Sequence, residues 1–444
     1  MFRTAALAGM AAFLSQAAFA QVTVFENVRI FDGTSDQLSQ PMHVLVRDNI
    51  IQQIAADPIP ADRSGTTTLI DGGGLTLMPG LIDAHTHLVM GSIPQGAVLS
   101  RDQNYVMLRA GAAAEDYLMR GFTTARDAGG PTFGLKEAID EGFVVGPRIY
   151  PSGATISQTS GHGDFRMPLE LPAAGDNPHF SERYGYATIA DGTDAVLRAT
   201  RENLMRGASQ IKVMAGGGVA SNFDPLDVTQ YTEEEMRAAV DAAASWNTYV
   251  TVHAYTPAAI QQAIRAGVKS VEHGQLADED TIRMMAENDV WLSLQPFLDD
   301  EHAIPFPEGS ANREKQLSIV AGTDTAYDLA RKHGVKLAWG TDTLFDPELA
   351  TKQNEQLTKM TRWFTPAEVL KMATHDNAQL LQLSGPRNPY PGRLGVVKEG
   401  ALADLLLVDG DVIADLELLD DPEANLVVIM KDGKIFKNTL SADQ

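Results

Sequence analysis

Residues 79–87 read PGLIDAHTH, and this stretch decides both the fold and the chemistry. The surrounding run 77–88 is apolar and follows turn residues, so it is predicted to be one buried strand. Side chains two apart on a strand share a face, so Asp83, His85 and His87 are expected to point the same way. Two imidazoles on one face at a strand end suit a divalent metal ion. The pair alone is ambiguous, because ordinary core or surface histidines often show the same spacing.

Between residues 78 and 385, short apolar runs alternate with amphipathic segments of helical length, such as 193–206 and 257–266. The predicted strands end at His87, Asp127, Ala154, Met214, Ala254, His273, Gln295 and Thr341. This strand–helix repetition predicts an α/β fold, a closed (β/α)8 TIM-like barrel over residues 78–385.

The flanks of the barrel carry β signals instead. Residues 21–77 contain short β-rich runs separated by Asp-Gly and Pro turns, and residues 386–444 contain two more such runs. Two β-rich flanks around one barrel most simply pair with each other. We therefore expect a small β-sandwich domain built from both.

Residues 1–20 are predicted to be a signal peptide. Arg3 gives a basic start, an Ala- and Leu-rich stretch follows, and residues 18–20 (AFA) have the small-x-small form of a cleavage site. The apolar stretch is short for a membrane span, and a retained N-terminal anchor is the alternative. The mature protein is expected to be exported, either periplasmic or secreted.

The composition narrows the chemistry and the partners. The chain of 444 residues has no cysteine, which excludes disulfides, a thiolate nucleophile and a cysteine-based metal site. Its formal charge of -23 argues against nucleic acid or an anionic membrane as partner. A small-molecule substrate is the remaining expectation.

Polar residues recur where the predicted barrel strands end. They are His85, His87, Lys212, His253, His273 and Asp342. Each has an ordinary explanation alone: a lysine can reach the rim, a histidine can be structural, and an aspartate can cap a helix. A buried Lys212 of lowered pKa can instead capture carbon dioxide as a carbamate, whose two oxygens can bridge two cations. The joint pattern at one barrel rim favours a metal centre.

At this point the chain resembles the amidohydrolase superfamily, in its binuclear-metal branch with a carboxylated lysine. The resemblance runs from residue 22 to 437 and rests on the motifs at 79–87, 121–130 (GFTTARDAGG), 340–342 (GTD) and 400–405 (GALADL). It implies two divalent metal ions, with zinc the first candidate. One ion would be held by His85, His87 and Asp342 and the other by His253 and His273, with N6-carboxylated Lys212 and a hydroxide bridging them. The resemblance also implies that the hydroxide attacks the carbonyl while Asp342 shuttles the proton to the leaving amine.

Two further residues narrow the reaction. His162 lies in the Gly-rich loop 160–164 (SGHGD) and can face a developing oxyanion, whereas Tyr231 can offer its hydroxyl to a substrate carboxylate. A loop histidine without a role and a packing tyrosine are the alternatives. Together the two segments resemble the imidazolonepropionase-related group of prolidase-like dipeptidases, Xaa-amino-acid carboxypeptidases and ochratoxin-type amidases. That resemblance implies the oxyanion role for His162, the carboxylate role for Tyr231, and, from family habit, a homo-oligomer.

The sequence thus predicts a metal-dependent hydrolase of the amide bond in dipeptides or N-acyl amino acids. The alternatives are a cyclic amidohydrolase of the imidazolonepropionase or hydantoinase type and, in another class, a non-catalytic solute-binding protein. Specificity is expected from the loops 295–306 and 343–346, with Gln295, Phe297, Asp299, Asp300 and Glu301 as candidate lining residues. The acidic run of three either favours a basic terminal residue or is a solvated loop.

Overall fold

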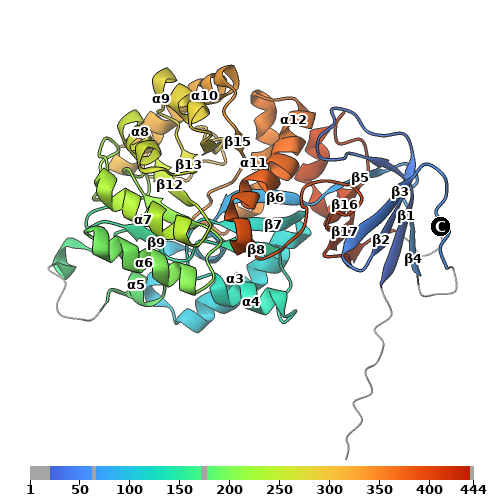
Figure 1. The fold of residues 1–444 in the computed structure, drawn as a ribbon, viewed down its shortest axis with the longest axis horizontal. Helices are drawn as coiled ribbons and strands as arrows, with labels where there is room; N and C mark the ends of the chain where they lie inside the picture. The colour runs from blue at the N-terminus through green and yellow to red at the C-terminus, as the bar shows by residue number, and fades with distance from the viewer. Residues whose placement is uncertain (1–20, 63–66, 172–177, 441–444) are drawn as a thin grey trace, which may run out of the picture.

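The computed structural model describes residues 21–62, 67–171 and 178–440 of the chain. A barrel surrounded by helices lies beside a smaller β-sheet unit that contains both flanks of the chain (Figure 1). The predicted signal peptide, residues 1–20, lies outside the described residues. Within the described part of the chain, no helix is long and apolar enough to cross a membrane.

The barrel strands pair in parallel and fall into two hydrogen-bonded sheets. In chain order they are β6 (Leu81–Thr86), β7 (Phe122–Asp127), β8 (Arg148–Pro151), β9 (Thr155–Ser157), β11 (Ile211–Met214), β12 (Val250–Ala254), β13 (Ser270–His273), β14 (Trp291–Ser293) and β15 (Leu337–Ala338). Backbone hydrogen bonds join the sheets at both seams, among them those from Ala84 N to Trp339 O (3.0 Å) and from Ser209 N to Pro151 O (2.8 Å). The predicted TIM-like barrel is confirmed, with β8 and β9 as two segments of its third strand.

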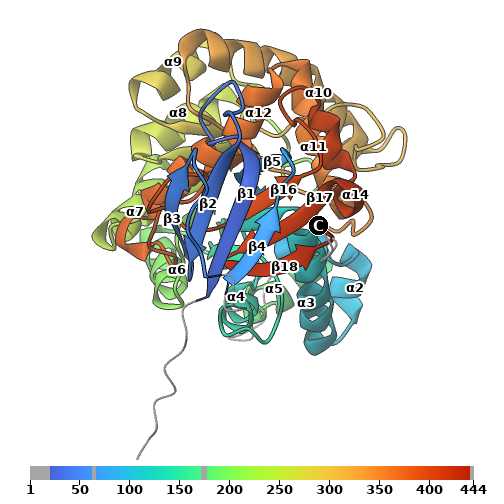
Figure 2. The ribbon, with the colours of Figure 1, turned by 90° about the vertical axis from the view of Figure 1, so that its right-hand side faces the viewer.

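Helices cover the outside of the barrel, as Figure 1 and Figure 2 show from two sides. The longer ones are α3 (Gln103–Met119), α4 (Phe133–Asp140), α6 (Thr193–Met205), α7 (Glu233–Ser245), α8 (Pro257–Ala266), α9 (Glu279–Glu287) and α10 (Ala311–His333). The shorter ones are α1 (Leu88–Gly91), α2 (Gln95–Ser100), α5 (Phe180–Arg183), α11 (Gln353–Thr358), α12 (Pro366–Lys371), α13 (Asn377–Leu381) and α14 (Pro422–Asn425). Local sequence sets their ends: Thr365 and Glu368 form a capping box at the start of α12, and Gly334 at φ 66° ends α10.

The single strand predicted over residues 77–88 is wrong, because the chain forms two strands there. β5 (Thr76–Pro79) belongs to the flanking sheet, and the barrel begins with β6 after Gly80. A Cβ atom on Gly80 would lie 2.1 Å from Thr123 Oγ1, so the chain passes a neighbouring strand at a point that only glycine fits. Continuous apolar character hides this break from a reading of the sequence.

The two flanks pair with each other, as expected. Their strands are β1 (Val22–Ile30), β2 (Met42–Arg47), β3 (Ile50–Ala55), β4 (Thr67–Asp71), β5, β16 (Leu405–Val408), β17 (Leu426–Lys431) and β18 (Lys434–Asn438). They follow the order β18-β17-β16-β5-β1-β2-β3, with β4 also on β1, and the flanks meet where Met78 of β5 opposes Leu406 of β16. Phe25 and Val46 share one buried cluster with Leu407. One further strand, β10 (Ala187–Ile189), extends the barrel sheet beyond β9.

A buried ion-pair network fastens the flanking sheet to the barrel. Arg148, the first residue of β8, donates to both carboxylate oxygens of Asp404 at 2.9 and 3.1 Å and to Asp432 at 2.6 Å. The amino group of Lys431, beside this network, donates to the backbone carbonyl of Gly146. Arg148 and Asp404 are buried and compensate each other, whereas Asp432 is 48% exposed.

Candidate active site

The structure brings the six predicted ligand residues together at the carboxyl ends of the barrel strands. The set lies on or directly after β6, β11, β12, β13 and β15 and consists of His85, His87, Lys212, His253, His273 and Asp342. Asp342 lies at their centre, with its Oδ1 at 3.1 Å from His85 Nε2 and 3.2 Å from His87 Nε2. Its Oδ2 lies 3.8 Å from His273 Nδ1.

The two histidines at the end of β6 are each held in place through the Nδ1 atom of the ring. His87 Nδ1 donates to the carbonyl of Gly129 at 2.8 Å, and His85 Nδ1 lies 2.8 Å from a carboxylate oxygen of Glu272. Each Nδ1 therefore carries the proton, which leaves the Nε2 lone pair facing Asp342. The ligand atoms of His85, His87 and Asp342 lie within 4.8 Å of one another, a donor set that fits a divalent cation.

His253, His273 and Lys212 form the second group. Burial holds the pKa of both histidines well below the usual value, so the imidazoles are neutral, as metal binding requires. His273 Nδ1 is buried without a hydrogen-bond partner, and His273 (φ 78°) and Asp342 (φ 51°) both lie in the left-handed region. Buried polar atoms usually have a hydrogen-bond partner, and strained backbone is common at functional sites. Both features are therefore typical of residues that bind a ligand.

Lys212 is 1% exposed, and its amino group lies 3.5 Å from His85 Nε2. Burial lowers the pKa of Lys212 to about 8. The neutral amine that a reaction with carbon dioxide needs is therefore accessible near neutral pH.

Sequence reasoning missed Glu272 and Arg126, which support the site from behind. Glu272 accepts from Arg126 Nη2 at 2.6 Å and from the Thr251 hydroxyl, and Arg126 also donates to the backbone of β6. Burial opposes the charge of Glu272, but Arg126 and His85 hold the pKa of its carboxyl well below the usual value. The only sequence signals were an acid and an arginine inside apolar strands, where charges are costly unless paired.

His162 is also at the site. Its ring stacks on that of His253 with centroids 4.0 Å apart, and its Nδ1 lies 2.7 Å from Ser221 Oγ and 3.3 Å from Asp224 Oδ2. A Cβ atom on Gly218 would lie 1.9 Å from His162 Nδ1. The Gly-Gly-Gly run at 216–218, which resembles a phosphate loop only superficially, thus lets the chain pass close to His162.

Tyr231 is not among the described residues that line the cavity beside Asp342. Its hydroxyl is buried without a hydrogen-bond partner, and burial raises its pKa well above the usual value. Tyr255 lines the cavity instead, with its ring centroid 4.9 Å from that of His273. The position of Tyr231 gives no support to the predicted carboxylate contact, whereas Tyr255, two residues after His253, was missed.

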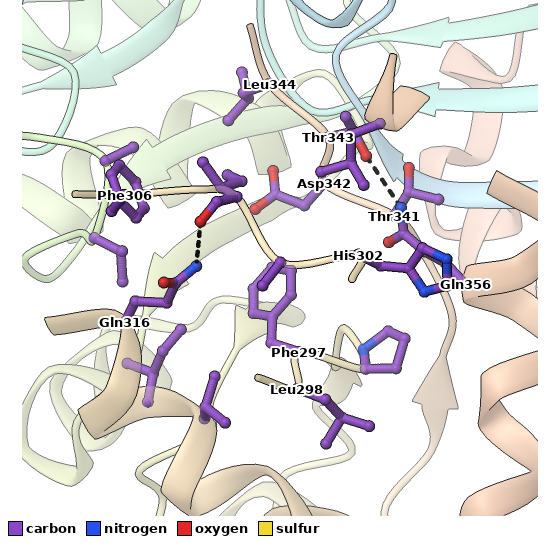
Figure 3. A pocket seen from close by; sticks show the side chains of 18 of the residues that line it. Phe297, Leu298, His302, Phe306, Gln316, Thr341, Asp342, Thr343, Leu344 and Gln356 are labelled. Carbon is purple, nitrogen blue, oxygen red and sulfur yellow. Dashed lines mark hydrogen bonds between the residues drawn. The ribbon is translucent and has the colours of Figure 1, made fainter. Parts of the chain in front are cut away.

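A cavity opens beside Asp342 and His162. Figure 3 shows Phe297, Phe306 and Leu344 around it. Metal-type ligands and a mostly apolar cavity thus share one end of the barrel.

The predicted lining residues fall into two groups. Phe297 lines the cavity, whereas Gln295 is buried beside His85 with its amide nitrogen 3.2 Å from Nδ1. Asp299, Asp300 and Glu301 are not among the described lining residues. The acidic run therefore does not form part of the described cavity lining.

Comparison with known proteins agrees with this geometry. The amidohydrolase family model matches residues 76–436. Ochratoxinase from Aspergillus niger is 35% identical over 377 residues, 81% of this chain and 75% of that protein, and imidazolonepropionase from Deinococcus radiodurans is 27% identical over 394 residues, 83% and 85%. The crystal structure of a prolidase complexed with N-methylphosphonate-L-proline superposes with a TM-score of 0.85 at 33% identity, covering 94% of this chain and 100% of that one. The chain therefore belongs to the amidohydrolase family and is a hydrolase of carbon–nitrogen amide bonds.

Proposed function

We propose that this protein cleaves the amide bond of dipeptides or N-acyl amino acids, so that the leaving amine is an α-amino acid. The observation that carries the proposal is the convergence of His85, His87 and His273 on Asp342 at the wall of a largely apolar cavity. The similarity to a prolidase and to ochratoxinase supports the substrate class.

His85, His87 and Asp342 would hold one divalent cation, and His253 and His273 would hold a second, most simply zinc in both positions. Lys212 would lie between them as N6-carboxylysine, formed when its neutral amine adds carbon dioxide and loses a proton. When bound, the two cations lower the pKa of water at the site and polarise the amide carbonyl.

The protein's own groups then move the proton and steady the charge. The Asp342 carboxylate, beside His85 and His87, is placed to accept a proton from water. From its central position it can return that proton to the leaving amine. His162, held by Asp224 and Ser221, can stabilise the developing oxyanion.

The test is amino-acid release by the mature protein after loading with zinc. The panel contains dipeptides with Pro, Arg, Phe and Leu at the carboxyl end, N-acyl amino acids and ochratoxin A, with hydantoin and dihydroorotate as ring controls. Release from linear amides is the expected result. Turnover of the ring controls alone would transfer the assignment to a cyclic amidohydrolase.

Metal content gives a readout besides activity. Two variants, Lys212→Ala and His253→Asn, are expected to lose zinc as well as turnover. Each substitution removes a proposed metal ligand. Full zinc occupancy in either variant would contradict the ligand assignment.

We also propose that the enzyme acts outside the cytoplasm, after the signal peptide is cleaved following Ala20. N-terminal sequencing of the exported protein would test this proposal.

A further inference from the structure

The cavity wall beside Asp342 is apolar over most of its extent. It contains Phe297, Leu298 and Phe306 from the segment after β14, Ile319 and Val320 of α10, and Leu344 from the loop after β15. Phe297 also packs on the ligand residues, with its ring stacked on His273 at a centroid distance of 6.2 Å and an angle of 23°. The apolar surface thus begins at the reacting centre and extends away from it (Figure 3).

The charges near this wall are already paired. Lys359 lines the cavity, but its ammonium lies 2.6 Å from Asp300. Asp299 pairs with Arg313 at 2.6 Å, and Glu301 is exposed outside the cavity. Among the described lining residues, no lysine or arginine is left to receive a charged substrate side chain. A charged group placed here would lose its hydration without gaining a partner.

We propose that the substrate group next to the scissile amide is a large, uncharged apolar group, aromatic or branched aliphatic, packed against Phe297, Phe306 and Val320. The inference rests on the proposed function and specifies its substrate class. Apolar area removed from water favours such a group, and the lining residues are mostly apolar. Basic substrates are disfavoured, because Asp299 and Asp300 are already paired and none of the three acidic residues is among the described lining residues.

Two matched series measure this preference with the zinc-loaded enzyme. The first keeps an acetyl group and varies the amino acid among Ala, Leu, Phe, Arg and Glu; the second keeps Ala and varies the acyl group among acetyl, 3-methylbutanoyl and benzoyl. In the series whose variable group occupies the cavity, kcat/KM is expected to rise about tenfold or more from the smallest to the largest apolar member. Flat rates in both series, or a preference for Arg or Glu, would overturn the proposal.

Val320 and Leu317 form a matched pair on α10. Val320 lines the cavity, whereas Leu317 is 43% exposed on the same helix. Val320→Asp is expected to lower kcat/KM for the best apolar substrate at least tenfold and to improve Arg relative to Phe, because it places an unpaired carboxylate in the wall. Leu317→Asp should leave unchanged both kcat/KM for the apolar substrate and the ratio of Arg to Phe substrates. Equal effects of the two variants would contradict the assignment, and Val320→Thr, which keeps the shape, replaces Val320→Asp if that protein does not fold.

A binding measurement separates this inference from the proposed function. If no linear amide is cleaved, the proposed function fails, but titration calorimetry with propionate, 3-phenylpropionate and 3-guanidinopropionate still tests the cavity. The phenyl compound is expected to bind the zinc-loaded protein at least tenfold more tightly than propionate, and the guanidino compound no more tightly than propionate. The reverse order would overturn the apolar preference itself.

Discussion

The barrel mouth, where His85 and Asp342 lie, and the junction between barrel and flanking sheet each bury an arginine against a carboxylate. They differ in whether a buried polar atom beside the pair lacks a hydrogen-bond partner. At the junction, Arg148 pairs with Asp404 and Asp432. At the mouth, Arg126 pairs with Glu272 in the same way, but His273 Nδ1 beside them has no hydrogen-bond partner. Buried polar groups in native proteins are normally satisfied. The comparison suggests different roles: the network at the junction serves stability, whereas the unpaired nitrogen beside Asp342 fits a site that binds a ligand.

The largest expected effect comes from Asp342→Asn, which removes the proton acceptor at the centre of the mouth. Turnover should fall about 1,000-fold or more, because general acid–base catalysis contributes on this scale. Zinc content, measured by atomic absorption, should persist, since the amide oxygen keeps one donor. The control is Asp299→Asn, the same change outside the cavity, which should leave turnover unaltered. Unchanged turnover in Asp342→Asn would contradict the proton-transfer role, whereas ligand binding without turnover in both the wild type and the variant would point to a solute-binding protein.

Glu272→Gln breaks the buried pair at the mouth. We expect a loss of about 3–5 kcal/mol in the free energy of unfolding, the usual cost of leaving a buried charge without its partner. Zinc affinity should also fall about 10–100-fold, because the group that orients His85 is weakened. Denaturant unfolding and competitive zinc titration measure the two effects separately. A variant with wild-type zinc affinity would show that Glu272 serves stability alone.

Asp404→Asn makes the matched change at the junction. The expected loss is smaller, about 2 kcal/mol, because Arg148 keeps Asp432 as a partner. Zinc affinity and turnover per folded molecule should stay at wild-type values, since the site lies at the other end of β8. A loss of zinc in this variant would show that the junction network also supports the metal site, which would contradict the proposed difference between the two networks.

The smallest expected effect concerns pH and Lys431 at the junction. Burial lowers the pKa of its amino group to about 8 from the ordinary 10.5, so the folded protein releases this proton before the unfolded chain does. The cost of burying the charge is present at low pH and is relieved as the pH rises. Relative to Lys431→Met, the wild-type free energy of unfolding should therefore rise by about 1 kcal/mol between about pH 7 and pH 9. Parallel pH curves for the two proteins would contradict this account.

Much of the fold could be predicted because its signals are local. The apolar strands and amphipathic helices repeat within short windows, and Thr365, Pro366 and Glu368 announce the start of α12. The break at Gly80 escaped prediction, because its cause is the contact with Thr123, a residue of the adjacent strand.

The sequence by itself determined the candidate ligand residues, because a parallel barrel brings the ends of its strands to one rim, so that residues far apart along the chain come close together. Only the tertiary structure decided what surrounds them. Arg126 meets Glu272 across 146 positions of the chain, and Tyr255 rather than Tyr231 reaches the cavity. Such contacts depend on how strands and loops pack against each other, and no local pattern of residues encodes that packing.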